Sequence, residues 1–148
     1  MMLLLIPFFL QGLAMFADEF YFHRQRGLPL WERVGHPLDS LTVLVCYLFI
    51  ALQVPTALNM NIYIGLCAFS CVFITKDEFI HTEKCSAEEN WLHSILFILH
   101  PLTFLSAGLM WKENLNSGFL ALQPALIFLF MMYQIIYWSL NGSAQRKS

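Results

Sequence analysis

The sequence predicts an all-α integral membrane protein, a bundle of about five transmembrane helices. Of its 148 residues, 58% are hydrophobic and only 12% are charged, and the mean hydropathy is +0.61. A soluble domain carries about 25% charged residues, so roughly half of the usual solvating charge is missing. Apolar stretches also recur at bilayer-crossing length, and in lipid such stretches satisfy their backbone amides only within helices.

Five spans are predicted, at Met1–Ala17, Leu38–Val54, Asn61–Thr75, Trp91–Met110 and Phe119–Leu140. Several are shorter than the roughly 20 helical residues that a hydrocarbon core requires. The first and third reach that length if their helices continue through the Asp-Glu-Phe segments at 18–20 and 77–79. Gly27, with Pro29 just beyond it, is a suitable stop for the first helix. Because no basic n-region or cleavage signal is present, we expect a retained first helix rather than a signal peptide.

Local signals predict where the second and fourth helices begin. Pro37 is expected in the first turn of the second helix, which puts His36 at its entrance and Asp39 one turn deeper. A capping box at Ser86–Glu89 predicts that the fourth helix begins near Ala87. The fifth span lacks acidic, basic and histidine residues and is interpreted as an added packing helix.

The basic residues predict the orientation. Seven of the eight Lys and Arg residues fall on one side of a five-span bundle, and only Lys112 falls on the other. The positive-inside rule then places the N-terminus outside and the C-terminus in the cytoplasm, with the plasma or inner membrane as the expected location. A net charge of −2 without a basic stripe excludes nucleic acid as a partner. No disulfides are expected, because the four cysteines lie within spans or on the cytoplasmic side.

An internal duplication is predicted within this single membrane domain. The segment Asp18-Glu19-Phe20 recurs at 77–79 with an offset of 59, and the histidines that follow keep offsets of 58 and 57. Two helical hairpins of the same orientation pack naturally around an axis along the membrane normal. The repeats would cover about 1–57 and about 58–111, followed by an extra helix at about 119–140.

Acids and histidines gather near the cytoplasmic ends of the first four helices. Glu19 and His23 form an i, i+4 pair on one helix face. On the third helix His81 pairs with Asp77 or with Glu78, and the sequence leaves that choice open. Ionisable groups at membrane depth are costly, so they normally face inward and pair. The predicted metal ligands are Glu19, His23, His36, Asp39, Asp77, Glu78, His81, Glu89, His93 and His100.

Carboxylates and neutral imidazoles without nearby thiolates suit iron, manganese or zinc. Because these ligands outnumber what one tetrahedral ion needs, we expect two divalent ions roughly 3.5–4 Å apart, with iron favoured. The remaining polar residues are assigned ordinary roles. These are capping or salt bridging for Asp18, Glu83 and Glu88, interfacial anchoring for Arg24, Arg26 and Glu32, and an aromatic belt for Trp31, Trp91, Trp111 and Trp138.

This pattern resembles the di-iron and di-manganese carboxylate bundles, in which Glu-x-x-His motifs and single Glu residues project into a bundle core. Glu78 and His81 have the spacing of that motif, whereas Glu19–His23, Glu32–His36 and Glu89–His93 have one residue more. The chain is also similar to membrane desaturases and hydroxylases, whose histidine boxes sit at the cytoplasmic face.

The favoured function is therefore that of a metal-dependent membrane enzyme acting on a lipid or quinone-like substrate. Oxidase, hydroxylase or desaturase chemistry and hydrolysis by a metal-bound water would use the same ligands. Three alternatives stay open: transit of protons or a divalent cation, haem ligation by facing histidines, and a structural subunit of a larger membrane complex. The acids argue against haem, and the shortage of polar residues in the outer half argues against transport.

Overall fold

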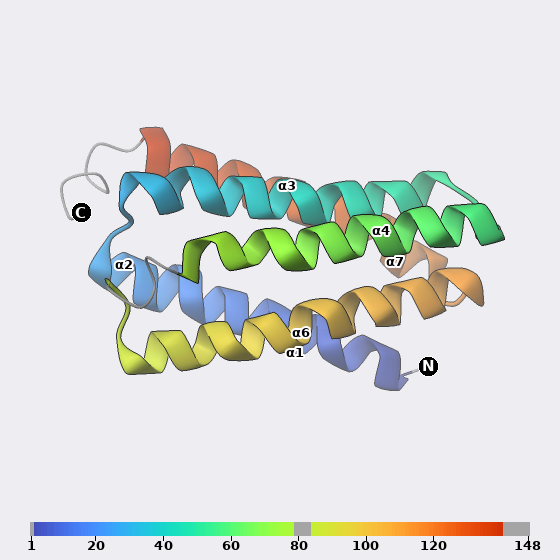
Figure 1. The fold of residues 1–148 in the computed structure, drawn as a ribbon, viewed down its shortest axis with the longest axis horizontal. Coiled ribbons are helices and arrows are strands. Elements are labelled where there is room, and N and C mark those ends of the chain that lie inside the picture. The colour runs from blue at the N-terminus through green and yellow to red at the C-terminus, as the bar shows by residue number, and fades with distance from the viewer. Residues whose placement is uncertain (1, 79–83, 141–148) are drawn as a thin grey trace.

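The computed structural model describes residues 2–78 and 84–140, and this part of the chain forms helices and no strands (Figure 1). The elements are α1 (Met2–Ala17), η1 (Asp18–Phe22), α2 (His23–Arg26), α3 (Leu30–Leu52), α4 (Ala57–Phe73), η2 (Ile74–Asp77), α6 (Ala87–Lys112), α7 (Ser117–Gln134) and η3 (Ile135–Leu140). Five continuous stretches are long and apolar enough to cross a membrane: Met2–Arg26, Leu30–Leu52, Ala57–Lys76, Ala87–Lys112 and Ser117–Trp138. The predicted all-helical chain with five such helices is confirmed, and the duplication stays a prediction.

The first helix continues through its acidic segment, as predicted. α1, η1 and α2 run on without a break until Gly27, whose φ of 77° lies in the left-handed region that glycine adopts without steric cost. The capping box of the fourth long helix is also confirmed. Ser86 is the N-cap of α6, and its Oγ accepts a hydrogen bond of 3.2 Å from the backbone N–H of Glu89.

The predicted start of the second long helix was wrong. α3 begins at Leu30, with Pro29 as its N-cap, and the Arg33 N–H donates to the Pro29 carbonyl at 3.1 Å. Pro37 lies inside the helix, where it removes one hydrogen bond from a helix of 23 residues that continues on both sides. The consequence for the site is that Glu32 and His36 come one turn apart on the same face.

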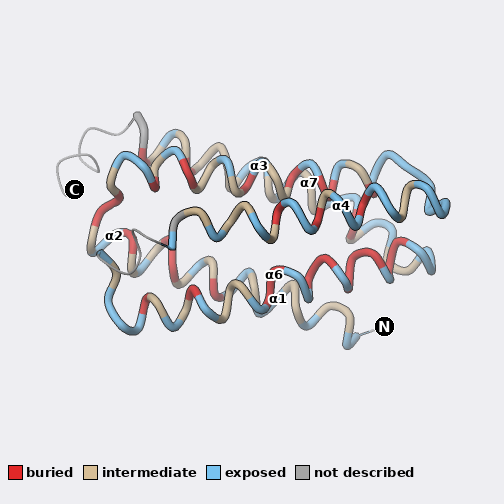
Figure 2. Tube along the Cα trace, viewed as in Figure 1, coloured by how far each residue is buried: buried red, intermediate tan, exposed pale blue. Residues whose placement is uncertain are grey.

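The helices lie side by side in one bundle (Figure 1). α3 packs against both α4 and α7, and α6 packs against α1 and α4. Buried positions follow the inward faces of the helices, as Figure 2 shows, whereas large apolar side chains such as Leu3, Phe9 and Val72 face outward. An outward apolar surface of this kind is what a helix bundle presents to lipid.

Candidate metal centre

The acidic segment of the first long helix is π-helical. In η1 the backbone hydrogen bonds run from residue i+5 to residue i, and the His23 N–H donates to the Asp18 carbonyl. In an ordinary α-helix Glu19 would share a face with His23 and Asp18 would turn away. The π-helical turn instead brings both acids inward: Asp18 is 8% exposed and Glu19 2%. π-helical turns of this kind are frequent at functional sites.

Four buried residues from two parts of the chain form a group that could hold a metal ion. They are Asp18, His23, Glu89 and His93, and one ligand atom from each lies within 4.8 Å of the others. His23 Nε2 lies 3.3 Å from Asp18 Oδ2 and 3.9 Å from Glu89 Oε1. His93 Nε2 lies 3.0 Å from Asp18 Oδ1. Two imidazoles and two carboxylates are a sufficient ligand set for a four-coordinate ion.

A second group of three possible ligands adjoins the first and shares His23 with it. Glu19, His23 and His36 also offer ligand atoms within 4.8 Å of one another. Glu19 Oε2 lies 3.5 Å from His23 Nδ1, and the ring centroids of His23 and His36 are 4.7 Å apart. The two edges of the His23 ring therefore face different carboxylates, with Asp18 and Glu89 beside Nε2 and Glu19 beside Nδ1.

One guanidinium is built into the same region. Arg26 Nη2 lies 2.7 Å from Glu32 Oε2 and 2.9 Å from Glu89 Oε1, and Arg26 Nη1 adds a second bond to Glu32. The Glu32 side chain is fully buried and that of Arg26 is 16% exposed. This pairing compensates only part of the buried negative charge. Within the described residues, four clustered carboxylates face one guanidinium, so bound cations, or protons on the histidines or carboxylates, must balance the rest.

Glu19 is held from the opposite side by the end of the last helix. The Trp138 indole N–H donates a hydrogen bond to Glu19 Oε1, and the Gln134 amide donates to Glu19 Oε2 at 3.4 Å. Ser40 in turn donates to Gln134 Oε1 at 2.8 Å. Donors from α7 and η3 thus fix this carboxylate, and Ser40 of α3 orients the Gln134 amide, as the neighbours of a metal ligand often do.

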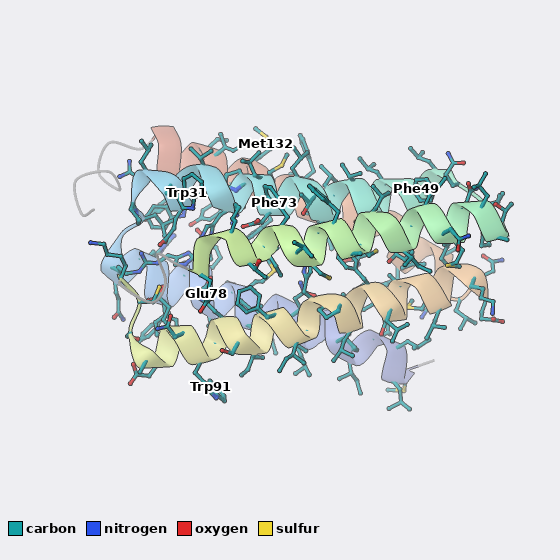
Figure 3. All side chains as sticks on the ribbon, viewed as in Figure 1. Trp31, Phe49, Phe73, Glu78, Trp91 and Met132 are labelled. Carbon is teal, nitrogen blue, oxygen red and sulfur yellow. The ribbon has the colours of Figure 1, made fainter. Side chains whose placement is uncertain are left out.

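The tryptophans divide into two kinds. Trp31 and Trp91 lie at the end of the bundle that carries the cluster, and both are exposed (Figure 3), as the predicted aromatic belt requires. Trp138 and Trp111 are buried instead, and the Trp111 indole N–H donates to the Gln53 carbonyl at 3.0 Å. For these two the belt was the wrong interpretation, because both side chains are buried and both indole N–H groups donate to protein acceptors.

The structure brings five of the ten predicted ligands together: Glu19, His23, His36, Glu89 and His93. Asp39 lies outside both groups, and its carboxylate pairs with Lys76 Nζ at 2.7 and 2.8 Å. Glu78 is exposed at the end of the third long helix (Figure 3) and belongs to neither group. The Asp77 side chain and His81 lie outside the described residues.

His100 is also placed away from both groups. Its Nδ1 accepts from the Gln11 amide at 3.3 Å, and its Nε2 lies 3.0 Å from Ser70 Oγ. Both ring nitrogens are therefore engaged in a polar network between α1, α4 and α6. Seven residues of helix, about 10 Å of rise, separate His100 from His93.

Sequence reasoning missed three residues of this region. The sequence prediction for Asp18 is capping or salt bridging, the common role of an acid near a helix end. Arg26 and Glu32 were assigned to the membrane interface, yet Glu32 is fully buried. The i, i+4 spacing of Glu32 and His36 was a usable signal, but the expected helix start at Pro37 left it outside any helix.

An elongated cavity of about 510 Å³ opens onto the cluster. Its polar end is lined by Asp18, Glu19, His36 and His93. Its other walls come from α1, α3, α6 and α7 and are mainly apolar, with aromatic side chains such as Phe8, Phe97 and Phe119. The volume lies in the range of ordinary small-ligand sites. From Asp18 back to Phe8 the cavity follows ten residues of helix, about 15 Å.

No protein-family model, no curated protein and no solved structure matches this chain. The functional argument therefore rests on the geometry of the cluster and its cavity.

Proposed function

We propose that this chain is a membrane-embedded metalloenzyme that acts on a lipid-like substrate. One observation carries the proposal: a mainly apolar cavity of about 510 Å³ ends on buried carboxylates and imidazoles that could hold a metal ion. Such a cavity excludes water from an apolar substrate while one end of that substrate meets the metal. The lipid bilayer supplies candidate substrates directly, because the bundle is built from membrane-length helices.

The ligand chemistry favours iron, with manganese or zinc as alternatives. Burial, together with the carboxylates of Glu89 and Glu32, raises the pKa of Cys85 to about 12, so this nearby thiol is protonated at neutral pH and offers no thiolate. The first ion would be held by Asp18, His23, Glu89 and His93. A second would use Glu19 and His36 on the other edge of the His23 ring. Bound metal would supply either oxygen activation or an activated water.

Metal content tests the metal half of this proposal. Elemental analysis of the purified chain is expected to find about two ions per chain if both groups are filled. In Asp18→Asn and His93→Gln we expect the content to fall from about two ions per chain to about one, since each change removes a ligand of the first ion only. Glu78→Gln is the matched control, because Glu78 is exposed outside both groups. Full metal in both ligand variants, with circular dichroism unchanged, would refute the assignment.

Substrate chemistry needs a separate measurement. The metal-loaded protein is incubated with membrane lipid extract, oxygen and a reductant, and the products are analysed by mass spectrometry. Oxygen insertion, desaturation and hydrolysis each give a distinct mass change. Products that depend on Asp18 but not on Glu78 support the enzyme, whereas a metal-loaded protein that alters no lipid contradicts it.

Proton or divalent-cation transfer is a second candidate, favoured by a hydrogen-bond chain inside the bundle. The chain runs from Gln11 to His100, from His100 to Ser70, and from Ser70 Oγ to Thr42 Oγ1 at 2.8 Å. Beyond it, the buried side chains toward the far end of the bundle are mostly apolar in the described residues. In proteoliposomes loaded with a pH-sensitive dye, proton flux that His100→Phe abolishes would favour this candidate. A proton flux equal to that of vesicles without protein would rule out proton transfer as the function.

A further inference from the structure

The deep end of the cavity contains two buried polar atoms that the protein leaves without a hydrogen bond. They are the Tyr47 hydroxyl oxygen and Gln11 Oε1, and neither has a partner within the described residues. Both residues line the cavity, and Tyr47 is only 3% exposed. Most buried polar groups in proteins are satisfied, so two orphans in one cavity indicate a ligand or water that completes them.

Ring contacts place these two residues within about one helical turn of each other along the bundle. The Tyr47 ring packs against Phe8 and Phe104, with centroids 6.2 and 5.9 Å apart. Phe8 lies one turn from Gln11 on α1, so both share a helix face. The Gln11 amide nitrogen is already committed to His100 Nδ1, which leaves its oxygen as the free acceptor.

The two atoms have complementary hydrogen-bonding roles. A phenolic O–H donates, whereas an amide oxygen only accepts. A ligand that satisfies both must accept one hydrogen bond and donate another, which is the capacity of an alcohol group. Gln11 lies seven residues before Asp18, about 10 Å along α1. The hydroxyl would therefore sit about 10 Å from the metal cluster, with apolar walls between.

We propose that this cavity binds a long-chain lipid alcohol, with its hydroxyl between Tyr47 and Gln11 and its chain extending toward the cluster. This deepens the proposed function by naming the substrate class. It also rests on that function, because the cavity is taken to be the substrate site. Metal is not needed for the recognition step, so binding is measured on the metal-free protein.

Three matched probes test the proposal: 1-dodecanol, 1-methoxydodecane and dodecane. The alcohol satisfies both protein atoms, the ether can only accept, and the hydrocarbon can do neither. With the metal-free protein in detergent micelles, calorimetry is expected to give affinities in that order. Each hydrogen bond should contribute about threefold to tenfold. Equal affinities for alcohol and hydrocarbon would overturn the proposal.

Single substitutions test which residue provides each hydrogen bond to the bound alcohol. Tyr47→Phe keeps the ring and should abolish the ether's advantage over the hydrocarbon, and Gln11→Ala should remove the advantage of the alcohol over the ether. Tyr63→Phe is the control, because that hydroxyl donates to the Phe104 carbonyl at 2.9 Å and Tyr63 does not line this cavity. An alcohol preference over the hydrocarbon that keeps its full wild-type size in both cavity variants would overturn the assignment to these residues.

The outcomes separate this inference from the metal assignment. Saturable alcohol binding by a chain that takes up no metal would keep the inference and refute the metalloenzyme. Metal uptake without saturable binding of any probe would keep the metal site and refute the lipid-alcohol cavity.

Discussion

The two ends of the bundle bury their side chains by different physical means. At one end the buried residues are carboxylates, imidazoles and one guanidinium, linked by ion pairs and hydrogen bonds. At the other, the buried cluster consists of aliphatic, aromatic and thiol side chains, including Ile50, Ala107 and Met110. Apolar packing thus joins the helices at one end, and ion pairs and hydrogen bonds join them at the other. The desolvation cost of the charged end points to function.

The comparison also shows what each end tolerates. In the apolar end a substitution acts through volume and shape at the contacts between helices. In the charged end a substitution acts mainly on the partner of the substituted residue. That partner stays buried and charged, so it keeps its desolvation cost without the compensating ion pair. Variants at the two ends should therefore differ in size of effect and in their response to metal.

The largest stability effect is expected for Arg26→Met. This change leaves the fully buried Glu32 without its guanidinium, and the loss of one partner of a buried pair costs about 3–5 kcal/mol. The free energy of unfolding of the metal-free protein in mixed micelles measures it. Arg24→Met is the control: Arg24 is exposed over the Phe20 and Tyr137 rings at 5.1 Å and should contribute about 1 kcal/mol or less. Equal effects of the two changes would show that Glu32 needs no buried cation.

Metal should stabilise the charged end and leave the apolar end unchanged. A ligand that binds only the folded state, at a free concentration 100 times its Kd, adds about 2.7 kcal/mol to the free energy of unfolding. We expect the full gain for Fe²⁺, Mn²⁺ or Zn²⁺ with the wild-type chain and a smaller gain with Asp18→Asn, which lacks one ligand of the first ion. Thermal unfolding with and without a chelator measures it. An equal gain in the variant would mean that the ion binds elsewhere.

Gly108→Ala is expected to destabilise the apolar end by about 1–3 kcal/mol. A Cβ at Gly108 would meet Tyr63 Cε1 at 3.0 Å, so α4 and α6 must separate or the ring must shift. Gly65→Ala is the matched control, because its Cβ would enter open space, and helix propensity predicts a gain of up to about 1 kcal/mol. Unfolding in mixed micelles compares the two. Metal should raise the free energy of unfolding of the Gly108 variant by as much as that of the wild type. A smaller gain would contradict the claim that the apolar and charged ends act independently.

The sequence predicted the long helices because apolar length is a property of the chain itself. It also predicted the Gly27 stop and the Ser86 cap, which depend on local backbone chemistry. The acids and histidines of the cluster were only partly predicted. Pairing rules for α-helices find Glu19 with His23, but they cannot find Asp18, whose inward position depends on a π-helical turn.

Long-range partners were the other feature that the sequence could not reveal. Arg26 meets Glu89 across 63 residues, and His100 meets Gln11 across 89. Such contacts depend on which helices are neighbours, and five apolar helices of similar length allow several arrangements. His100 shares a helical stripe with His93, yet its partners come from α1 and α4, so a shared face did not imply a shared site.

The smallest effect is expected for Lys76→Met. Lys76 Nζ lies 2.7 Å from Asp39 Oδ1, but the two side chains are 19% and 22% exposed, so solvent screens the pair. Ion pairs of this kind contribute about 0–1 kcal/mol, and the contact of Lys76 Nζ with the Phe73 ring, 4.9 Å from its centroid, adds little at a partly exposed site. The free energy of unfolding should therefore fall by about 1 kcal/mol or less, and the metal content should stay at the wild-type level. A drop in metal content would show that Asp39 and Lys76 belong to the charged cluster, and the boundary between the two ends would then lie deeper in the bundle.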